Sequence, residues 1–247
     1  MPYTLALCLD APMQSWGVRS RFTSRDTARE PTKSGVVGVV AAALGIDRDD
    51  DEKIQALAQL EIGVRVDREG LLERDYHTVS NVPNTEGKNH RTVVSHRYYL
   101  ADALFLVAVQ SEHHDTLFRI HAALNQPHWP VYLGRKAFVP ARPLVGPSPD
   151  DSYLGVAEGR VEGVLESHVW LENSKKECDK AVRDLRDGNA RRLRTLVDGR
   201  PTDARAEPRH DVPVSFRSRD RRFYTRSVCR GEVVLTESMI AGEQSCI

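Results

Sequence analysis

The sequence predicts an α+β protein whose first part has a ferredoxin-like, RNA-recognition-type order of elements and whose second part is small and β-rich. Two observations carry this prediction. Between Tyr3 and Lys136 the hydrophobic pattern changes period in the order strand, helix, strand, strand, helix, strand. Four prolines then fall between Pro140 and Pro149, and the composition shifts beyond them. We therefore expect one part at 1–149 and another at 150–247.

The bulk composition is that of a globular protein. Among 247 residues, 35 Lys and Arg balance 35 Asp and Glu, so any basic surface must arise from segregation of charge along the chain. The four cysteines form no CxxC pair and predict reduced thiols, with no metal and no cofactor. Because the chain contains no signal-like start and no apolar run of about 18 residues, we expect a cytoplasmic protein without a membrane segment.

The first predicted strand, Tyr3–Leu9, alternates leucines with small residues and ends before Pro12. The turn that follows, from Met13 to Gly17, contains Trp16. A lone tryptophan at a strand end is more often part of the core, but it is also a candidate surface for stacking a base. Both interpretations are open at this point.

A locally basic loop follows and leads into a helix. Its cations are Arg19, Arg21, Arg25, Arg29 and Lys33. The pair Lys33-Ser34 is not a nucleotide-binding loop, because the glycines that such a loop requires are missing before it. The helix from Gly35 to Leu44 nevertheless offers free N–H groups at its start, where an anion could dock. We expect large residues at Gly35 and Gly38 to be poorly tolerated, since both allow close packing.

The next elements complete the predicted order. The acidic run 47–52 predicts the charged start of a helix rather than a metal site, because it lacks the spacing of a calcium loop. We expect strands at 60–66 and 101–110, and an amphipathic helix at 115–125. A last strand, 130–136, runs into the basic turn that contains Arg135 and Lys136.

A hairpin is predicted between Asp75 and Tyr99. Two runs rich in β-branched and aromatic residues flank a polar turn at 81–90. Basic groups interleaved with aromatics suit single-stranded nucleic acid, because bases stack while phosphates are neutralised. An ordinary solvated hairpin is the alternative.

The second part is less regular in sequence. Alternating pieces at 154–171 precede a charged insertion at 172–210, which we expect to be mobile and either helical or disordered. Strand-like segments return at 212–235. The arginines between Arg217 and Arg230 are best explained as a solvated sheet edge.

Several of these stretches together resemble the Cas-five family, and specifically its CasD branch in the CRISPR type I-E Cascade surveillance complex. The matching stretches are APMQSWG, PTKSGVVGVVAAALGIDRDD, DYHTV, RYYLADA and YLGRK, which occur in order between about Leu5 and Lys136. The second part matches only through FRSRDRRFYTRSV, and the insertion departs from the pattern.

The resemblance implies a ferredoxin-like RNA-recognition-type domain with a projecting thumb at about 75–99. It implies a non-catalytic subunit that caps the 5′ handle of the crRNA. Its partners would be a backbone subunit beside the thumb and the large subunit that recognises target DNA, so that DNA is contacted indirectly. The side chains it implies for RNA contact are Gln14, Trp16, Arg21, Lys33, Ser34, Arg135 and Lys136 on the platform, and His77, Arg91, Arg97 and Tyr99 on or beside the thumb.

Two other functions remain open from the sequence. Members of the family from the type I-C variant are metal-independent endoribonucleases, so this chain could process precursor crRNA with His77 or His96 as a base and a nearby Lys or Tyr. The chain could also be a scaffold that makes no RNA contact.

Overall fold

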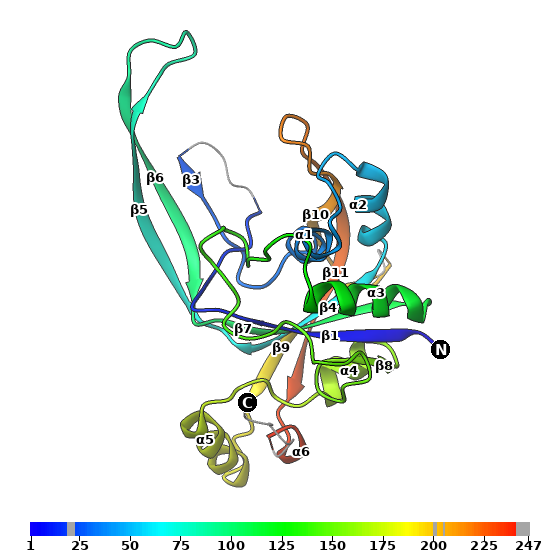
Figure 1. Ribbon diagram of the computed structural model, residues 1–247. Coiled ribbons are helices and arrows are strands. Elements are labelled where there is room, and N and C mark those ends of the chain that lie inside the picture. Colours follow the sequence, from blue (N-terminus) through cyan, green and yellow to red (C-terminus); the bar gives the residue numbers. More distant parts are fainter. Residues whose placement is uncertain (19–22, 200–201, 205, 241–247) are drawn as a thin grey trace.

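The computed structural model describes residues 1–18, 23–199, 202–204 and 206–240 (Figure 1). In chain order the elements are β1 (Tyr3–Asp10), β2 (Met13–Gln14), β3 (Ser24–Arg25), α1 (Lys33–Leu44), α2 (Asp51–Ala58), β4 (Glu61–Arg68), β5 (Leu71–Val82), β6 (Arg91–Ala101), β7 (Leu104–Ser111), α3 (His114–Asn125), β8 (Val156–Glu158), α4 (Val161–Ser167), α5 (Lys175–Arg186), β9 (Arg192–Gly199), β10 (Ala206–Ser215), β11 (Arg222–Val234) and α6 (Glu237–Ile240). The described helices are all too short or too polar to cross a membrane.

The described residues form an antiparallel seven-stranded sheet in the order β10-β11-β9-β4-β7-β1-β8. Strand β7 lies near its centre, and every residue of that strand is buried. Strands β8 to β11 come from the second part of the sequence, so the sheet runs through both predicted parts. The division at residue 149 stays a prediction.

The alternation predicted for the first strand sorts its side chains to the two faces of this sheet. Leu5, Leu7 and Leu9 enter the core beneath α1 and α3. Ala6 and Cys8 point to the opposite face, where they pack with residues of α4. Helices therefore cover both faces, with α1 and α3 above the sheet and α4 below it in Figure 1.

Helix α1 begins and ends as its sequence predicts. Thr32 caps the start, where its Oγ1 accepts a hydrogen bond from the amide of Gly35 at 3.2 Å. Gly45 ends the helix in the left-handed conformation, with φ of 69°. The acidic run also behaves as predicted, since Asp50 caps α2 and its side chain accepts from the amide of Lys53.

The predicted hairpin is present and projects from the main sheet (Figure 1). Strands β5 and β6 pair antiparallel from Leu71↔Ala101 to Val82↔Arg91, with a bulge between Val79 and Val82. On its other side, β6 pairs with the short strands β2 and β3. Nearly all residues of β5 are exposed, from one end of the strand to the other.

The prediction of a strand at 130–136 is wrong, because that segment forms a turn. Gly134 has φ of 103°, which breaks an extended conformation. The amide of Leu133 bonds to the carbonyl of Phe138 at 2.7 Å and so closes the turn. The position beside β1 is taken instead by β8, which pairs with Tyr3–Leu5.

Two further elements of the second part differ from the prediction. Within 154–171 the segment Val161–Ser167 is helical, because Val161 and Leu165 lie one turn apart and both face the sheet. The charged insertion at 172–210 contains α5 and also β9, which pairs with β4 and β11. Alternating arginines at 192 and 194 obscure that strand in the sequence.

Candidate nucleic-acid interface

The hairpin has two chemically different faces. Side chains at alternate positions of a strand share a face, so Ser95, Arg97 and Tyr99 of β6 lie on one side. Their partners on β5 are His77, Asp75 and Glu73. The other face carries Tyr76 against His96 and Arg74 against Tyr98. Three of the predicted contact residues, His77, Arg97 and Tyr99, therefore share one face.

Three arginines from separate segments gather at this face. Strand β3 pairs parallel with β6 and sets Arg25 beside Arg97. Arg135 reaches β6 from the turn at 133–138, and its Nη2 donates to the carbonyl oxygen of Tyr98 at 2.6 Å. That carbonyl lies between the residues of β6 that pair with β3 and those that pair with β2. Arg135 thus fills the gap between the two short strands.

The turn that carries Arg135 is anchored on the first motif and on the hairpin. The amide of Ser15 donates to the carbonyl of Leu133 at 3.0 Å. The ring of Phe138 lies 6.0 Å from the ring of Tyr99, centroid to centroid, and the Arg135 guanidinium lies 5.1 Å from the Phe138 ring centre. The structure therefore brings APMQSWG, RYYLADA and YLGRK together.

Among the described residues, the three arginines at this face outnumber its carboxylates, Asp75 and Glu73. Burial lowers the pKa of Arg135 below its ordinary value, and the positive charges of Arg97 and Arg25 lower it further, against the opposing charge of Asp75. Arg25, Arg97 and Arg135 form no ion pair with any described residue, and Arg97 and Arg135 bond only to the Ser95 hydroxyl and the Tyr98 carbonyl. Crowded cations that form no ion pair are the electrostatic signature of a site for an anion such as a phosphate.

Two predicted contact residues are part of the core instead. The Gln14 side chain is fully buried, and its Nε2 donates to the carbonyls of Ala103 at 2.8 Å and Leu9 at 3.1 Å. Trp16 is 1% exposed and packs against α1. Of the two interpretations of Trp16, the structure favours the core, and neither side chain offers a surface to RNA.

The predicted anion site at the start of α1 is already occupied by a carboxylate. The amide of Lys33 donates to Asp211 Oδ2 at 2.9 Å, and its Nζ pairs with Asp198 at 2.8 Å. Arg226 bonds to both carboxylates. Lys33 is buried and neutralised, and the adjacent Ser34 contacts the Thr32 hydroxyl at 3.3 Å.

The remaining predicted residues are more accessible. Arg91 and Lys136 are exposed, and neither forms an ion pair with a described residue. His77 and Tyr99 are half-buried. Arg21 lies outside the described residues. Arg25 was predicted only as part of the basic loop, and it joins the site because β3 pairs with β6.

A groove of about 680 Å³ lies on the other side of the basic loop, between residues 27–32 and strands β9 to β11. Most of its cations are paired. Glu30 accepts from Arg194 and Arg209, and Arg230 pairs with Glu207. Burial opposes the ionisation of Glu30, but these two arginines outweigh it and lower the pKa of Glu30. Because its cations are already paired, the groove is less suited to bind a polyanion than the hairpin face is.

The two histidines predicted as alternative bases for RNA cleavage lie on opposite faces of the hairpin. His77 shares the face of Arg97, whereas His96 lies on the opposite face with its ring 5.8 Å from Tyr76. Each would need its own Lys or Tyr partner within reach, and Tyr76 is such a neighbour for His96. Across the residues with described positions, no group of three or more His, Cys, Asp or Glu could hold a metal ion.

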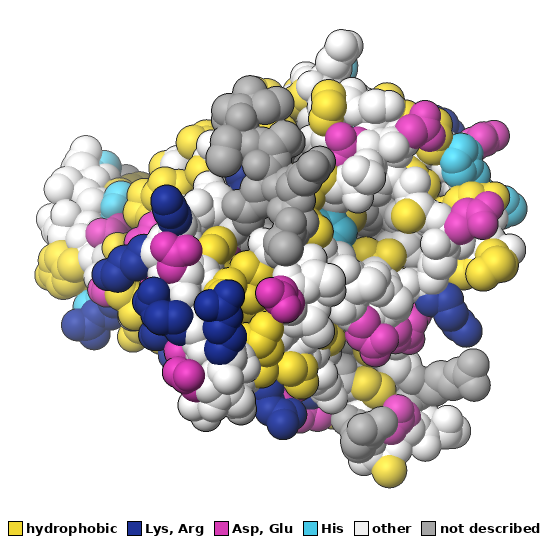
Figure 2. All heavy atoms as spheres, turned by 90° about the horizontal axis from the view of Figure 1, so that it is seen from below, with side chains coloured by type: hydrophobic (Ala, Val, Ile, Leu, Met, Phe, Trp, Pro, Cys, Tyr) yellow, Lys and Arg dark blue, Asp and Glu magenta, His cyan; other side chains and the backbone are white. Residues whose placement is uncertain are grey.

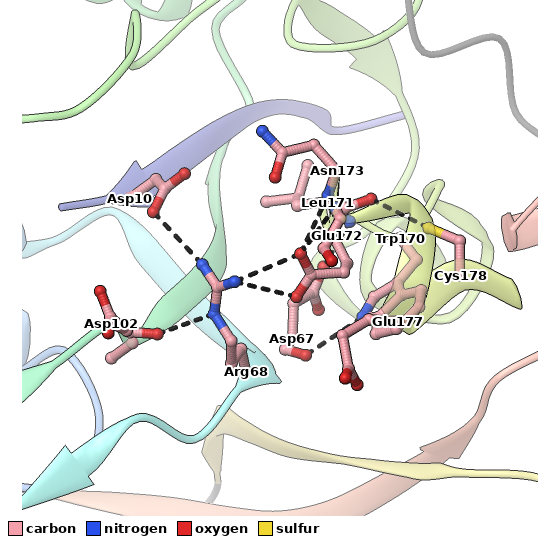
Figure 3. Close-up of polar contacts among 12 residues, drawn as sticks. Asp10, Asp67, Arg68, Asp102, Trp170, Leu171, Glu172, Asn173, Glu177 and Cys178 are labelled. Carbon is pink, nitrogen blue, oxygen red and sulfur yellow. Dashed lines mark hydrogen bonds and ion pairs between the residues drawn. The ribbon is translucent and has the colours of Figure 1, made fainter. Parts of the chain in front are cut away.

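A polar cluster fixes the base of the hairpin to the rest of the protein (Figure 3). Arg68 ends β4, and its Nε donates to the carbonyl of Asp102 at 2.7 Å. Its Nη1 bonds to both carboxylate oxygens of Glu172, at 3.1 and 3.2 Å, and its Nη2 lies 3.7 Å from Asp10. Beside it, Trp170 Nε1 donates to the carbonyl of Asp67. The cluster joins the hairpin base to the segment that starts α5.

Fold and site together define a mixed α/β protein with antiparallel sheets and a cationic hairpin face. A sequence model of the family described as "CRISPR-associated protein (Cas_Cas5)" matches residues 4–229, and the chain belongs to that family. It is 38% identical over 154 residues to the CRISPR system Cascade subunit CasD of Escherichia coli (strain K12), a match that covers 57% of this chain and 68% of that protein.

Two solved structures are similar over nearly the whole chain. One is described as a crystal structure of a Cas protein, with a TM-score of 0.68, 35% identity, and coverage of 94% of this chain and 95% of the other. The second is a chain of a CRISPR RNA-guided surveillance complex, with a TM-score of 0.74, 33% identity, and coverage of 96% and 92%. The family predicted from the sequence motifs is thereby confirmed.

Proposed function

We propose that this chain is a crRNA-binding subunit of a type I-E Cascade complex and that it holds the 5′ handle of the crRNA. The observation that carries the proposal is the convergence of Arg25, Arg97 and Arg135, from three separate segments, without a described ion-pair partner. The similarity to CasD and to a chain of an RNA-guided surveillance complex supports it.

In this proposal the hairpin β5–β6 is the thumb, and the RNA backbone lies along the face of Arg97. The order β4-β7-β1-β8 with α1 and α3 on one face supports a ferredoxin-like, RNA-recognition-type unit beneath it. Tyr99 and Phe138 supply aromatic surface beside the cations. The proposed protein partners are the backbone subunit next to the thumb and the large subunit.

The test is the affinity of the purified chain for a short RNA that carries the 5′ handle. We expect Arg97→Gln to weaken binding and to reduce the slope of log affinity against log salt by about 0.7, the value for one phosphate contact with a single strand. Arg74→Gln is the matched control, because Arg74 belongs to the same hairpin but lies on its other face. Equal effects of the two substitutions would overturn the proposed face.

The proposed role is non-catalytic. The similarity to the Cascade subunit CasD supports this part of the proposal. Incubation of the chain with precursor repeat RNA in the presence of a chelator tests it directly. Cleavage at a single position, lost in His77→Ala, would replace it with the endoribonuclease of the type I-C kind.

A further inference from the structure

Helix α5 presents a strongly cationic face that the proposed function does not use. Its exposed cations are Lys175, Lys176, Lys180, Arg183 and Arg186. With 100° between successive residues, these five lie within one arc of the helix surface, interrupted by Asp179 and followed by Asp187 at the C-cap. None of the five forms an ion pair with another described residue. Figure 2 shows Lys and Arg side chains gathered on the lower face, where Figure 1 places α5.

The opposite side of α5 is already buried. Ala181 packs with Trp170, Leu193 and Met239 in a small separate core, and Cys178 packs against it. No large hydrophobic side chain of α5 is exposed. A basic amphipathic helix binds a membrane by inserting its apolar side, and here that side is not available.

The same composition disfavours a protein partner. Stable protein interfaces have an apolar core and are depleted in lysine, whereas this face consists of lysine and arginine with one aspartate, Asp179, and has no apolar centre. A nucleic-acid backbone can be bound by cationic side chains alone, without an apolar centre.

The composition of the face disfavours single strands, and its helical shape disfavours RNA duplexes. It contains no aromatic side chain on which an unpaired base could stack. The deep, narrow major groove of an RNA duplex does not admit an α-helix, whereas the major groove of B-form DNA does. Double-stranded DNA offers dense phosphates beside a groove that admits a helix, and it needs no stacking aromatic group.

We propose that the exposed face of α5 is a second nucleic-acid surface, which docks the phosphate backbone of double-stranded DNA without reading its sequence. The inference goes beyond the proposed function, in which DNA is contacted only indirectly. It places direct DNA contact on the opposite side of the main sheet from α1 and α3 (Figure 1).

The test measures binding of the full chain to a fluorescent 25-base-pair DNA duplex of arbitrary sequence over a series of salt concentrations. We expect the double variant Lys180→Gln/Arg183→Gln to bind roughly tenfold more weakly at low salt and to reduce the salt slope by about 1.8, or 0.9 for each phosphate contact. The variant Arg219→Gln/Arg221→Gln removes the same charge from another exposed loop, and we expect it to retain most of the affinity.

Three outcomes would overturn this inference. They are equal losses in the two double variants, equal binding of an RNA duplex of the same length, and equally effective competition by an acidic polypeptide such as polyglutamate. Binding of the handle RNA, measured in parallel, should not change in Lys180→Gln/Arg183→Gln. If handle binding is absent from the unmodified chain while duplex binding behaves as expected, the proposed function fails and this inference stands.

Discussion

Gly134 lies so close to Ser15 that no side chain fits between them: a Cβ atom at residue 134 would lie 2.0 Å from the backbone oxygen of Ser15. The φ of 103° at Gly134 is also one that other residues rarely adopt. This contact presses the turn that carries Arg135 onto the first motif. It therefore connects the packing of the turn to the geometry of the cationic hairpin face.

The first prediction follows from this contact. We expect Gly134→Ala to displace the turn, to destabilise the protein by about 1–3 kcal/mol, and to weaken handle RNA binding, because Arg135 no longer reaches the Tyr98 carbonyl. Urea unfolding and RNA titration measure the two effects. Gly87→Ala is the control for a glycine with positive φ, since it lies at the hairpin tip with open space around it. Unchanged RNA affinity in a folded Gly134→Ala protein would contradict the prediction.

The second prediction is that alanine has opposite effects on stability at Gly35 and Gly38, two glycines that the sequence alone does not distinguish. A Cβ at Gly35 would lie 2.6 Å from Trp16 Cε3, whereas a Cβ at Gly38 meets nothing within 4 Å. The expectation that large residues are poorly tolerated at both positions therefore has a steric reason at Gly35 alone. We expect Gly35→Ala to lower the free energy of unfolding by about 1–3 kcal/mol, and Gly38→Ala to raise it by about 0.5–1 kcal/mol through helix propensity.

Chemical denaturation of the two variants decides this second prediction. Tryptophan fluorescence provides an additional readout, because only Gly35→Ala should disturb the surroundings of Trp16. Equal stability changes in the two variants would show that the contact with Trp16 is not the cause.

These contacts also show what could and could not be predicted from the sequence. Helix α1 was predicted correctly because Thr32 and Gly45, its caps, lie within the local pattern. The burial of Lys33 was missed because its partner Asp198 is 165 residues away. Nothing in the basic loop distinguishes Arg25 from its neighbours until β3 pairs with β6. Local order is readable from sequence, whereas charge neutralisation and cross-strand pairing depend on the tertiary fold.

The third prediction concerns pH. Burial opposes the ionisation of Asp211, but the hydrogen bonds and charge of Arg226 and the amide of Lys33 outweigh it, so the pKa of Asp211 lies below its ordinary value. When folding lowers the pKa of a carboxyl, that group binds fewer protons in the folded state than in the unfolded state at acidic pH. Its contribution to stability is therefore complete above about pH 4, near the unfolded pKa, and is lost as pH falls towards the folded pKa.

We expect Asp211→Asn to cost about 3 kcal/mol at pH 7, because it leaves the largely buried Arg226 with one carboxylate partner instead of two. The variant should also lose less stability than the unmodified chain between pH 5 and pH 3. Urea unfolding across this pH range measures both effects. Asp220→Asn removes an exposed pair with Arg222 and should change stability by less than about 0.5 kcal/mol. An unchanged acid dependence in Asp211→Asn would show that another carboxyl dominates.

The fourth prediction concerns the attachment of the hairpin. Because Arg68 joins Asp102 at the hairpin base to the buried Glu172 before α5, its removal breaks a two-point contact between the hairpin base and that segment (Figure 3). We expect Arg68→Met to destabilise the protein by about 2 kcal/mol, less than a fully buried pair because Arg68 is one-third exposed. Hydrogen exchange should accelerate at residues 68–72 and 100–104. Arg192→Met, which breaks an exposed pair with Glu232, should leave both readouts nearly unchanged. Slow exchange at the hairpin base in Arg68→Met would mean that strand pairing alone holds the hairpin in place.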